Sequence, residues 1–203
     1  MNPGAKTFNN TVYYLLGRSL FFFIILISLT ACKKNYLPRP RGYFRIDFPE
    51  KRYQTYKSDC QYTFEYPVYA KIVKYDNHRT EPCWINIEFP SYKGKIHITY
   101  WPLKDNLFQH MEDVRILAYK HIIKADDIIE NPIIYPERNV YGIFYDIKGN
   151  TACSASFYIT DSTDNFLSGA LYFSVKPNSD SLAPVIKFFK EDMQHLIETF
   201  EWN

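Results

Sequence analysis

A short apolar run near the N-terminus, Leu20–Ile27, decides which part of this chain can fold into a domain. Lys6 and Arg18 precede it without any acidic residue, and charge returns at Lys33. Eight consecutive apolar residues are too few for a membrane-spanning helix, which needs about 20. A basic start, a short apolar segment and small residues before a cleavage point are typical of a secretory signal peptide. We therefore exclude residues 1–31 from the folded domain.

The leader ends in Leu29-Thr30-Ala31-Cys32, which resembles a bacterial lipobox. This pattern predicts that the signal peptide is removed and that Cys32 becomes an acylated N-terminus. The alternative is an uncleaved N-terminal anchor helix with Cys32 as an ordinary thiol. Each buried methylene group contributes about 0.8 kcal/mol to membrane binding, so several acyl chains hold a protein far more firmly than one. We expect a tethered domain that works at a membrane surface.

Residues 32–41 form the predicted tether between this lipid and the domain, which we place at 42–203. Pro38 and Pro40 favour an extended backbone. The basic side chains of Arg39, Arg41 and Arg45 are candidates for binding a partner or anionic lipid headgroups, at about 1 kcal/mol per charge. The alternative is a solvated linker whose charges bind nothing specific.

The charge balance gives no support to nucleic-acid binding. Two of the 24 Lys and Arg residues lie in the leader, which leaves 22 against 22 Asp and Glu in residues 32–203. The net charge of the tethered chain is therefore near zero, whereas nucleic-acid-binding domains carry a basic excess.

Three further cysteines allow at most one intramolecular disulfide, and an exported domain lies where disulfides persist. We favour a Cys60–Cys83 bridge, because both residues open strand-like runs. The alternative is that Cys60, Cys83 and Cys153 are all buried free thiols, which are common in protein cores.

Alternation of apolar and polar residues predicts most of the secondary structure. Strands are expected at 42–48, 62–66, 70–75, 83–89, 95–101, 140–147, 152–160 and 166–175. Turn residues at 90–94 make the fourth and fifth of these a hairpin. Helical spacing predicts helices at about 105–124, with Asp105 or Asn106 as cap, and from near Ser181 to about Phe200, with Pro184 in the first turn. Asn131-Pro132 and Tyr135-Pro136 are expected to break the segment between them.

Runs of strands with segregated helices indicate an α+β fold, an antiparallel β-sheet with flanking helices. The order of elements in the second half resembles the Mog1/PsbP-type α/β/α sandwich.

The sequence does not predict an enzyme, a metal site or a cofactor. It contains no metal-binding cluster of histidines and cysteines, no nucleophile elbow and no glycine-rich phosphate loop. His97 is expected on the surface of a strand. His110 and His121 are expected on one face of the first helix, where they pack beside its apolar stripe and bind no metal. The acidic residues Asp126, Asp127 and Glu130 are interpreted as a solvated cap or turn.

Residues 36–53, Tyr-Leu-Pro-Arg-Pro-Arg-Gly-Tyr-Phe-Arg-Ile-Asp-Phe-Pro-Glu-Lys-Arg-Tyr, closely resemble the opening of the gliding-motility lipoprotein family GldD of Bacteroidetes. The lipobox leader and the segments 83–85, 100–102 and 200–202 fit the same family. The resemblance implies a lipid-anchored, non-catalytic protein of the cell envelope that works with other gliding lipoproteins and the type IX secretion apparatus. Lys33-Lys34 lacks the acidic signature of surface-exported lipoproteins, so we expect the outer membrane and a periplasmic orientation.

Two functions remain open. The first is a scaffold or assembly factor that docks against envelope partners through residues 39–53. The second is a periplasmic lipid- or glycan-binding module with an aromatic pocket that involves Trp84 and Trp101; a deep apolar cavity would favour it.

Overall fold

The computed structural model describes residues 16–21, 45–57, 59–75, 81 and 83–203. The chain divides into two compact units, 1–41 and 42–203. In the first unit, residues 16–21 are helical, and Cys32 lies outside the described residues. Among the residues described, no helix is both long and apolar enough to cross a membrane.

The second unit is built around a seven-stranded sheet in which every neighbouring pair is antiparallel. Its strands, in spatial order, are β3 (Lys71–Lys74), β4 (Ile85–Phe89), β5 (Gly94–Pro102), β9 (Asn165–Phe173), β8 (Cys153–Thr160), β7 (Val140–Gly149) and β6 (Ala125–Tyr135). A smaller antiparallel sheet has the order β1 (Tyr53–Tyr56), β2 (Tyr62–Pro67) and β10 (Glu201–Trp202).

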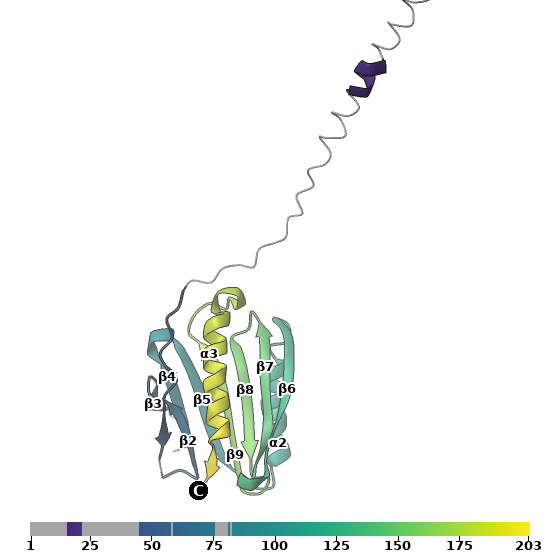
Figure 1. Cartoon of the computed structure of the whole chain (residues 1–203). Helices are drawn as coiled ribbons and strands as arrows, with labels where there is room; N and C mark the ends of the chain where they lie inside the picture. The colour runs from purple at the N-terminus through teal and green to yellow at the C-terminus, as the bar shows by residue number, and fades with distance from the viewer. Residues whose placement is uncertain (1–15, 22–44, 58, 76–80, 82) are drawn as a thin grey trace, which may run out of the picture. The chain divides into compact units, whose positions relative to one another are not determined.

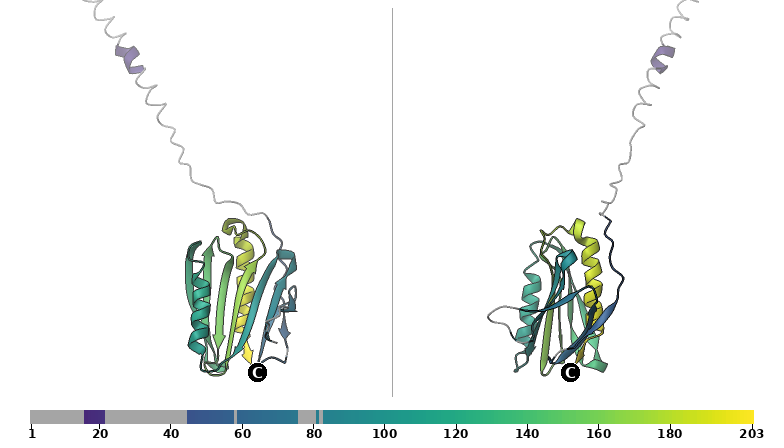
Figure 2. Two further views of the ribbon diagram at one scale, coloured as in Figure 1. Left: turned by 180° about the vertical axis from the view of Figure 1, so that it is seen from behind. Right: turned by 90° about the vertical axis from the view of Figure 1, so that its left-hand side faces the viewer.

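The two long helices, α2 (Leu107–Tyr119) and α3 (Ser179–Glu198), lie on opposite faces of the large sheet. Figure 1 shows α3 in front of the strands, and the right-hand view of Figure 2 shows the sheet edge-on between the helices. The predicted α+β class with flanking helices is confirmed.

Burial of both faces explains the composition of the central strand β8, all of whose eight residues are buried. Ala155, Phe157 and Ile159 belong to the hydrophobic cluster under α3, whereas Cys153 and Tyr158 belong to the cluster under α2. Close packing in the α3 cluster requires a glycine on the neighbouring strand. A Cβ atom at Gly169 would lie 2.3 Å from the Phe157 ring.

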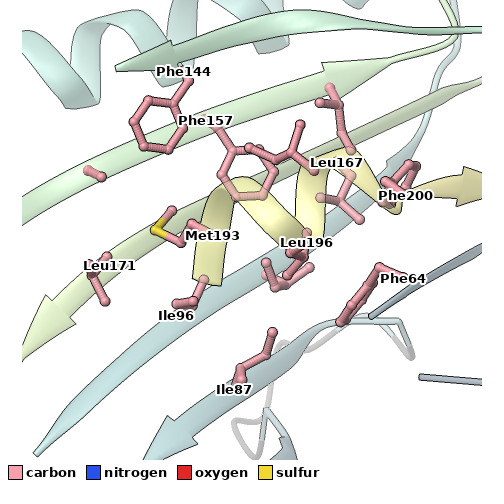
Figure 3. Close-up of a cluster of buried hydrophobic side chains, with 14 of the residues drawn as sticks. Phe64, Ile87, Ile96, Phe144, Phe157, Leu167, Leu171, Met193, Leu196 and Phe200 are labelled. Atoms are coloured by element: carbon pink, nitrogen blue, oxygen red, sulfur yellow. The ribbon is translucent and has the colours of Figure 1, made fainter. Parts of the chain in front are cut away.

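The apolar stripe of α3 fills the cluster on its side of the sheet. Val185, Phe189, Met193 and Leu196 recur at helical spacing and are buried. Figure 3 shows Met193 and Leu196 among Phe157, Leu167 and Phe200. All described residues of both clusters lie between Ile46 and Trp202.

The strand predicted at 42–48 is wrong for the part that the structure describes. Residues 45–52 form no strand, and the first strand is β1. Phe48 instead stacks on Phe188 of α3, with the ring centroids 4.4 Å apart, so contact with a helix replaces strand pairing here. The strand β10 was not predicted, because two residues are too few to show alternation.

The expected break at Asn131-Pro132 is also wrong, because both residues lie inside β6. That strand is at the edge of the sheet, where β7 is its only partner among the described strands. A proline lacks a backbone N–H, and an edge strand tolerates this because half of its backbone groups have no strand partner. The interpretation of Asp126, Asp127 and Glu130 as a cap or turn is wrong as well: they are exposed, as expected, but lie in β6.

The helices were predicted with inaccurate ends. α2 ends at Tyr119, so Ile122 is 60% exposed and lies outside the helical stripe. Asn106 occupies the N-cap position of α2, although its side chain makes no cap hydrogen bond. α3 begins at Ser179, with Asn178 accepting a hydrogen bond from the backbone N–H of Ser181, so Pro184 falls in its second turn.

Candidate functional site

The predicted lipidation site Cys32 and the basic residues Arg39 and Arg41 lie outside the described residues. The third basic candidate, Arg45, is described. Its guanidinium is 89% exposed and pairs with Asp47 at 3.0 Å. Surface pairs of this kind contribute little to stability, so Arg45 is free to exchange its partner for another anion.

Cys60 and Cys83 form a disulfide, the pair that the sequence favoured. The bridge joins the chain just before β2 to the chain just before β4. Tyr62 donates a hydrogen bond from its hydroxyl to the backbone carbonyl of Cys83 at 2.7 Å. Cys153 is a buried free thiol on β8.

Downstream of Arg45, the chain is fixed to α3 by a buried carboxylate. Asp192 is 1% exposed. Its carboxylate accepts hydrogen bonds from Lys51 at 2.7 Å, from Tyr53 at 3.0 Å and from Tyr69 at 2.8 Å. The Lys51 ammonium also donates to the carbonyl of Phe188 at 2.6 Å and lies 3.5 Å from the centroid of its ring.

We call Lys51, Tyr53, Tyr69 and Asp192 the carboxylate clamp. Burial raises the pKa of Asp192, while the hydrogen bonds from Lys51 and the two tyrosines oppose this rise. Burial and the neighbouring Asp192 raise the pKa of both Tyr53 and Tyr69, so the phenols remain donors at neutral pH. The clamp therefore gives the 48–53 part of the predicted docking segment a structural role.

A cavity of about 320 Å³ lies on the opposite face of the sheet, beside α2. The left-hand view of Figure 2 shows that α2 covers only one half of this face. At the border, Val114, Leu117 and Ala118 of α2 form one wall, and Tyr75 and Trp84 contribute aromatic rings to the cavity. The volume is at the lower end of the roughly 300–1,000 Å³ typical of small-molecule sites.

Small side chains on three adjacent strands form the floor of this cavity. They are Thr99 on β5, Ser168 and Ala170 on β9, and Cys153 and Ser156 on β8. Larger residues at these positions would fill the space between α2 and the aromatic rings. The cavity thus results from the sizes of side chains that are distant in sequence.

Several polar groups in the cavity have hydrogen-bond partners within the fold. Thr99 and Ser168 share a hydrogen bond of 2.7 Å between their hydroxyls, and His97 binds the side-chain oxygen of Asn86. The Trp84 indole N–H donates to the carbonyl of Tyr100 at 2.9 Å. By contrast, the hydroxyl of Ser156 is buried and has no hydrogen-bond partner in the part of the chain that the structure describes.

The cavity lining carries no charged side chain at neutral pH. Burial lowers the pKa of His97, with nearby Lys95 adding to the effect, and burial also lowers the pKa of His121. Burial raises the pKa of Cys153 to about 11 and that of Tyr172 to about 12. Both histidines are therefore neutral, and the thiol and the phenol keep their protons.

The sequence anticipated this site only in part. Trp84 lines the cavity, as expected for an aromatic pocket. Trp101 does not line it: its ring centroid lies 4.8 Å from that of Trp84, and it stacks on His110. The expectation that His97 is a surface residue is wrong, because its ring is half buried and lines the cavity. His110 packs in the α2 face as predicted, while His121 lies beyond the end of the helix.

The cavity has the properties of a binding site. Aromatic rings, a neutral lining and a buried hydroxyl, that of Ser156, with no partner among the described residues can hold a ligand. Among the residues that the structure describes, no group of three or more histidines, cysteines or acidic residues is placed to hold a metal ion.

Comparison with known proteins identifies the relationship. A family model described as gliding motility lipoprotein GldD matches residues 33–202, which is most of the chain. The chain belongs to this family. It therefore has a role in gliding motility and is a lipid-anchored protein of the cell envelope.

No curated protein matches the chain. Among solved structures, the solution structure of cyanobacterial PsbP (CyanoP) from Synechocystis sp. PCC 6803 is similar, with 11% sequence identity and a TM-score of 0.46. The match covers 76% of this chain and 95% of the cyanobacterial chain.

Proposed function

We propose that this GldD-family chain is a non-catalytic scaffold or assembly factor of the gliding apparatus in Bacteroidetes. In this role, acyl chains on Cys32, palmitate among them, hold the protein in the outer membrane with its domain facing the periplasm. The domain docks against other gliding-motility lipoproteins and components of the type IX secretion apparatus. No cofactor takes part.

The observation that carries this proposal is a group of exposed apolar side chains at the C-terminal end of α2. Ile116 on the helix is 48% exposed, and Ile122 and Ile123 in the following turn are 60% and 90% exposed. Grouped apolar side chains at the surface of a soluble domain mark contacts with other proteins. We call Ile116, Ile122 and Ile123 the α2 edge.

The basic residues next to the tether supply a second candidate contact. Arg39, Arg41 and Arg45 precede the clamp, and the exposed guanidinium of Arg45 is available to an acidic partner or to lipid headgroups. The adjoining residues Lys51 and Tyr53 are engaged in the carboxylate clamp. We therefore restrict the docking function of the 39–53 segment to its basic first half.

Gliding of cells with chromosomal variants tests both surfaces. Ile122→Glu with Ile123→Glu changes the α2 edge, and Arg39→Glu with Arg41→Glu and Arg45→Glu reverses the basic segment. The matched control is Ile134→Glu, since Ile134 is 62% exposed on the edge strand β6. We expect the α2-edge variant to abolish gliding and crosslinking to motility or secretion components, with normal abundance on immunoblots.

The triple arginine variant separates docking from tethering. Loss of gliding at normal abundance would assign a contact to these residues, and normal gliding would make 33–45 only a tether. If the α2-edge variant glides like the control and retains its crosslinks, the scaffold proposal in this form is wrong.

A second candidate function, the periplasmic lipid- or glycan-binding module, is favoured by the cavity beside α2. It differs from the scaffold role because it requires a bound small molecule and no protein partner.

A further inference from the structure

The cavity beside α2 contains one buried polar atom that the fold leaves without a partner. Ser156 is 7% exposed, and its hydroxyl has no hydrogen bond within the described residues. A buried hydroxyl without a partner costs about 1–3 kcal/mol, so such groups are uncommon in native proteins. Ser156 lies on β8 in the floor of the cavity, where a bound molecule could complete its hydrogen bonding.

The walls around Ser156 are fixed by hydrogen bonds before any ligand binds. Trp84 is held through its indole N–H by Tyr100, and His97 is held by Asn86. The ring of Tyr75 meets those of Trp84 and His97 edge-on, with centroid distances of 6.1 and 5.8 Å. Because these rings are already positioned, little side-chain freedom is lost on binding.

We propose that this cavity binds an uncharged, mainly apolar small molecule, whose single hydrogen-bonding group pairs with the hydroxyl of Ser156. The aromatic rings and the side chains of Val114 and Leu117 contact its apolar part. The site narrows the second candidate function to a lipid-like ligand.

The satisfied polar groups argue against a sugar. A glycan carries several hydroxyls, each of which needs a partner when it leaves water. Here Thr99 and Ser168 bind each other and His97 binds Asn86. A sugar would have to compete with these bonds for several of its hydroxyls, whereas a molecule with one polar group can pair with Ser156 and leave them intact.

The absence of charge in the lining argues against an ionic ligand. Transferring an unpaired charge into an apolar site is far more costly than transferring a neutral group. The cavity is lined by neutral side chains only, Asp, Glu, Lys and Arg being absent from its described walls. A fatty acid in its carboxylate form is thus a poorer ligand than the corresponding alcohol or ester.

Two dyes of the same skeleton test these features in buffer. The protein is the chain 33–203, which keeps every described residue of both hydrophobic clusters, since these lie within Ile46–Trp202. N-phenyl-1-naphthylamine is neutral and has one N–H group, and 8-anilino-1-naphthalenesulfonate adds a sulfonate to it. We expect saturable 1:1 binding of the neutral dye and at least about tenfold weaker binding of the sulfonate.

Variants locate the dye. Leu117→Trp narrows the mouth from an exposed position on α2, and Ile116→Trp on the same helix is the matched control because Ile116 does not line the cavity. Ala170→Leu fills the floor independently. We expect Leu117→Trp and Ala170→Leu each to lower the affinity for the neutral dye at least about tenfold, and Ile116→Trp to leave this affinity unchanged. Ser156→Ala should lower it about fivefold.

Several results would overturn the inference. The neutral dye could fail to bind saturably, bind no more tightly than the sulfonate, or be displaced by glucose. Ile116→Trp could also lower its affinity while Leu117→Trp and Ala170→Leu do not. Thermal unfolding of each variant shows which ones are folded, and the two cavity variants are independent of each other. Since the assay uses purified protein, its outcome is separate from that of the gliding and crosslinking tests.

Discussion

The replacement of Lys51 by Met offers a direct test of the carboxylate clamp. Methionine keeps most of the length of the side chain and its contact with the Phe188 ring, but it removes the cation that pairs with Asp192 at 2.7 Å. Removing one member of a buried ion pair costs about 3–5 kcal/mol. Because the side chain of Lys51 is 27% exposed, we expect a loss at the lower end of this range. Lys51→Met should lower the free energy of unfolding by about 3 kcal/mol at pH 7.5.

The loss should depend on pH in a defined direction. Burial raises the folded-state pKa of Asp192, so the contribution of this group to stability is greatest below the unfolded pKa, about 3.9, and falls as pH rises through the folded pKa. Lys51 limits that rise, and its removal raises the folded pKa further. A lower pH protonates a larger fraction of Asp192, and a neutral carboxyl has no ion pair with Lys51 to lose. We therefore expect Lys51→Met to lower the free energy of unfolding less at pH 4 than at pH 7.5.

Urea unfolding of the chain 33–203, followed by tryptophan fluorescence at pH 4 and pH 7.5, measures both values. The control is Lys187→Met, because Lys187 is an exposed residue of α3, the helix that carries Asp192. We expect this control to change the free energy of unfolding by no more than about 0.5 kcal/mol. A loss that is equal at the two pH values, or larger at pH 4, would refute the assignment of Lys51 as the counter-ion of Asp192.

Two further predictions concern the cysteines. The double variant Cys60→Ser with Cys83→Ser should lower the free energy of unfolding by about 3 kcal/mol, because it opens a loop whose ends are 23 residues apart. A change below about 1 kcal/mol in the same urea assay would contradict this. Cys153 should resist iodoacetamide at pH 8 in the folded protein and react in urea, because burial raises its pKa to about 11 and only the thiolate is reactive. Peptide mapping by mass spectrometry checks this, and rapid labelling of the native chain would show that Cys153 is accessible.

Part of the candidate site was within reach of sequence reasoning. Alternation identified the strands that carry His97 and Cys153, and helical spacing placed Val114 and Ala118 on the buried face of α2. The binding-module hypothesis named Trp84 as part of an aromatic pocket, and Trp84 lines the cavity. Alternation could not show which face of the sheet is half uncovered, because that depends on the length of α2 and on its position over the strands.

The carboxylate clamp was beyond the same reasoning. Lys51, Tyr69 and Asp192 are spread over more than two thirds of the chain and have no motif spacing. Alternation in 42–48 predicted a strand, but the contacts of Phe48 and Lys51 with α3 give this segment a different path. Tertiary contacts overrode a local pattern here, because a buried carboxylate must find donors wherever the fold can supply them.

By itself, the sequence determined the lipobox, the resemblance to the GldD family, the antiparallel α+β class and most strands and helices, because each depends on neighbouring residues or on a short period. Only the tertiary structure decided that Lys51 meets Asp192 and that small side chains from β5, β8 and β9 lie together under Trp84. The physical reason is that the order of strands in the sheet, β5-β9-β8, differs from their order in the chain. Thr99 and Ser168, which pair in the floor of the cavity, are therefore 69 residues apart in sequence, and no local pattern predicts this contact.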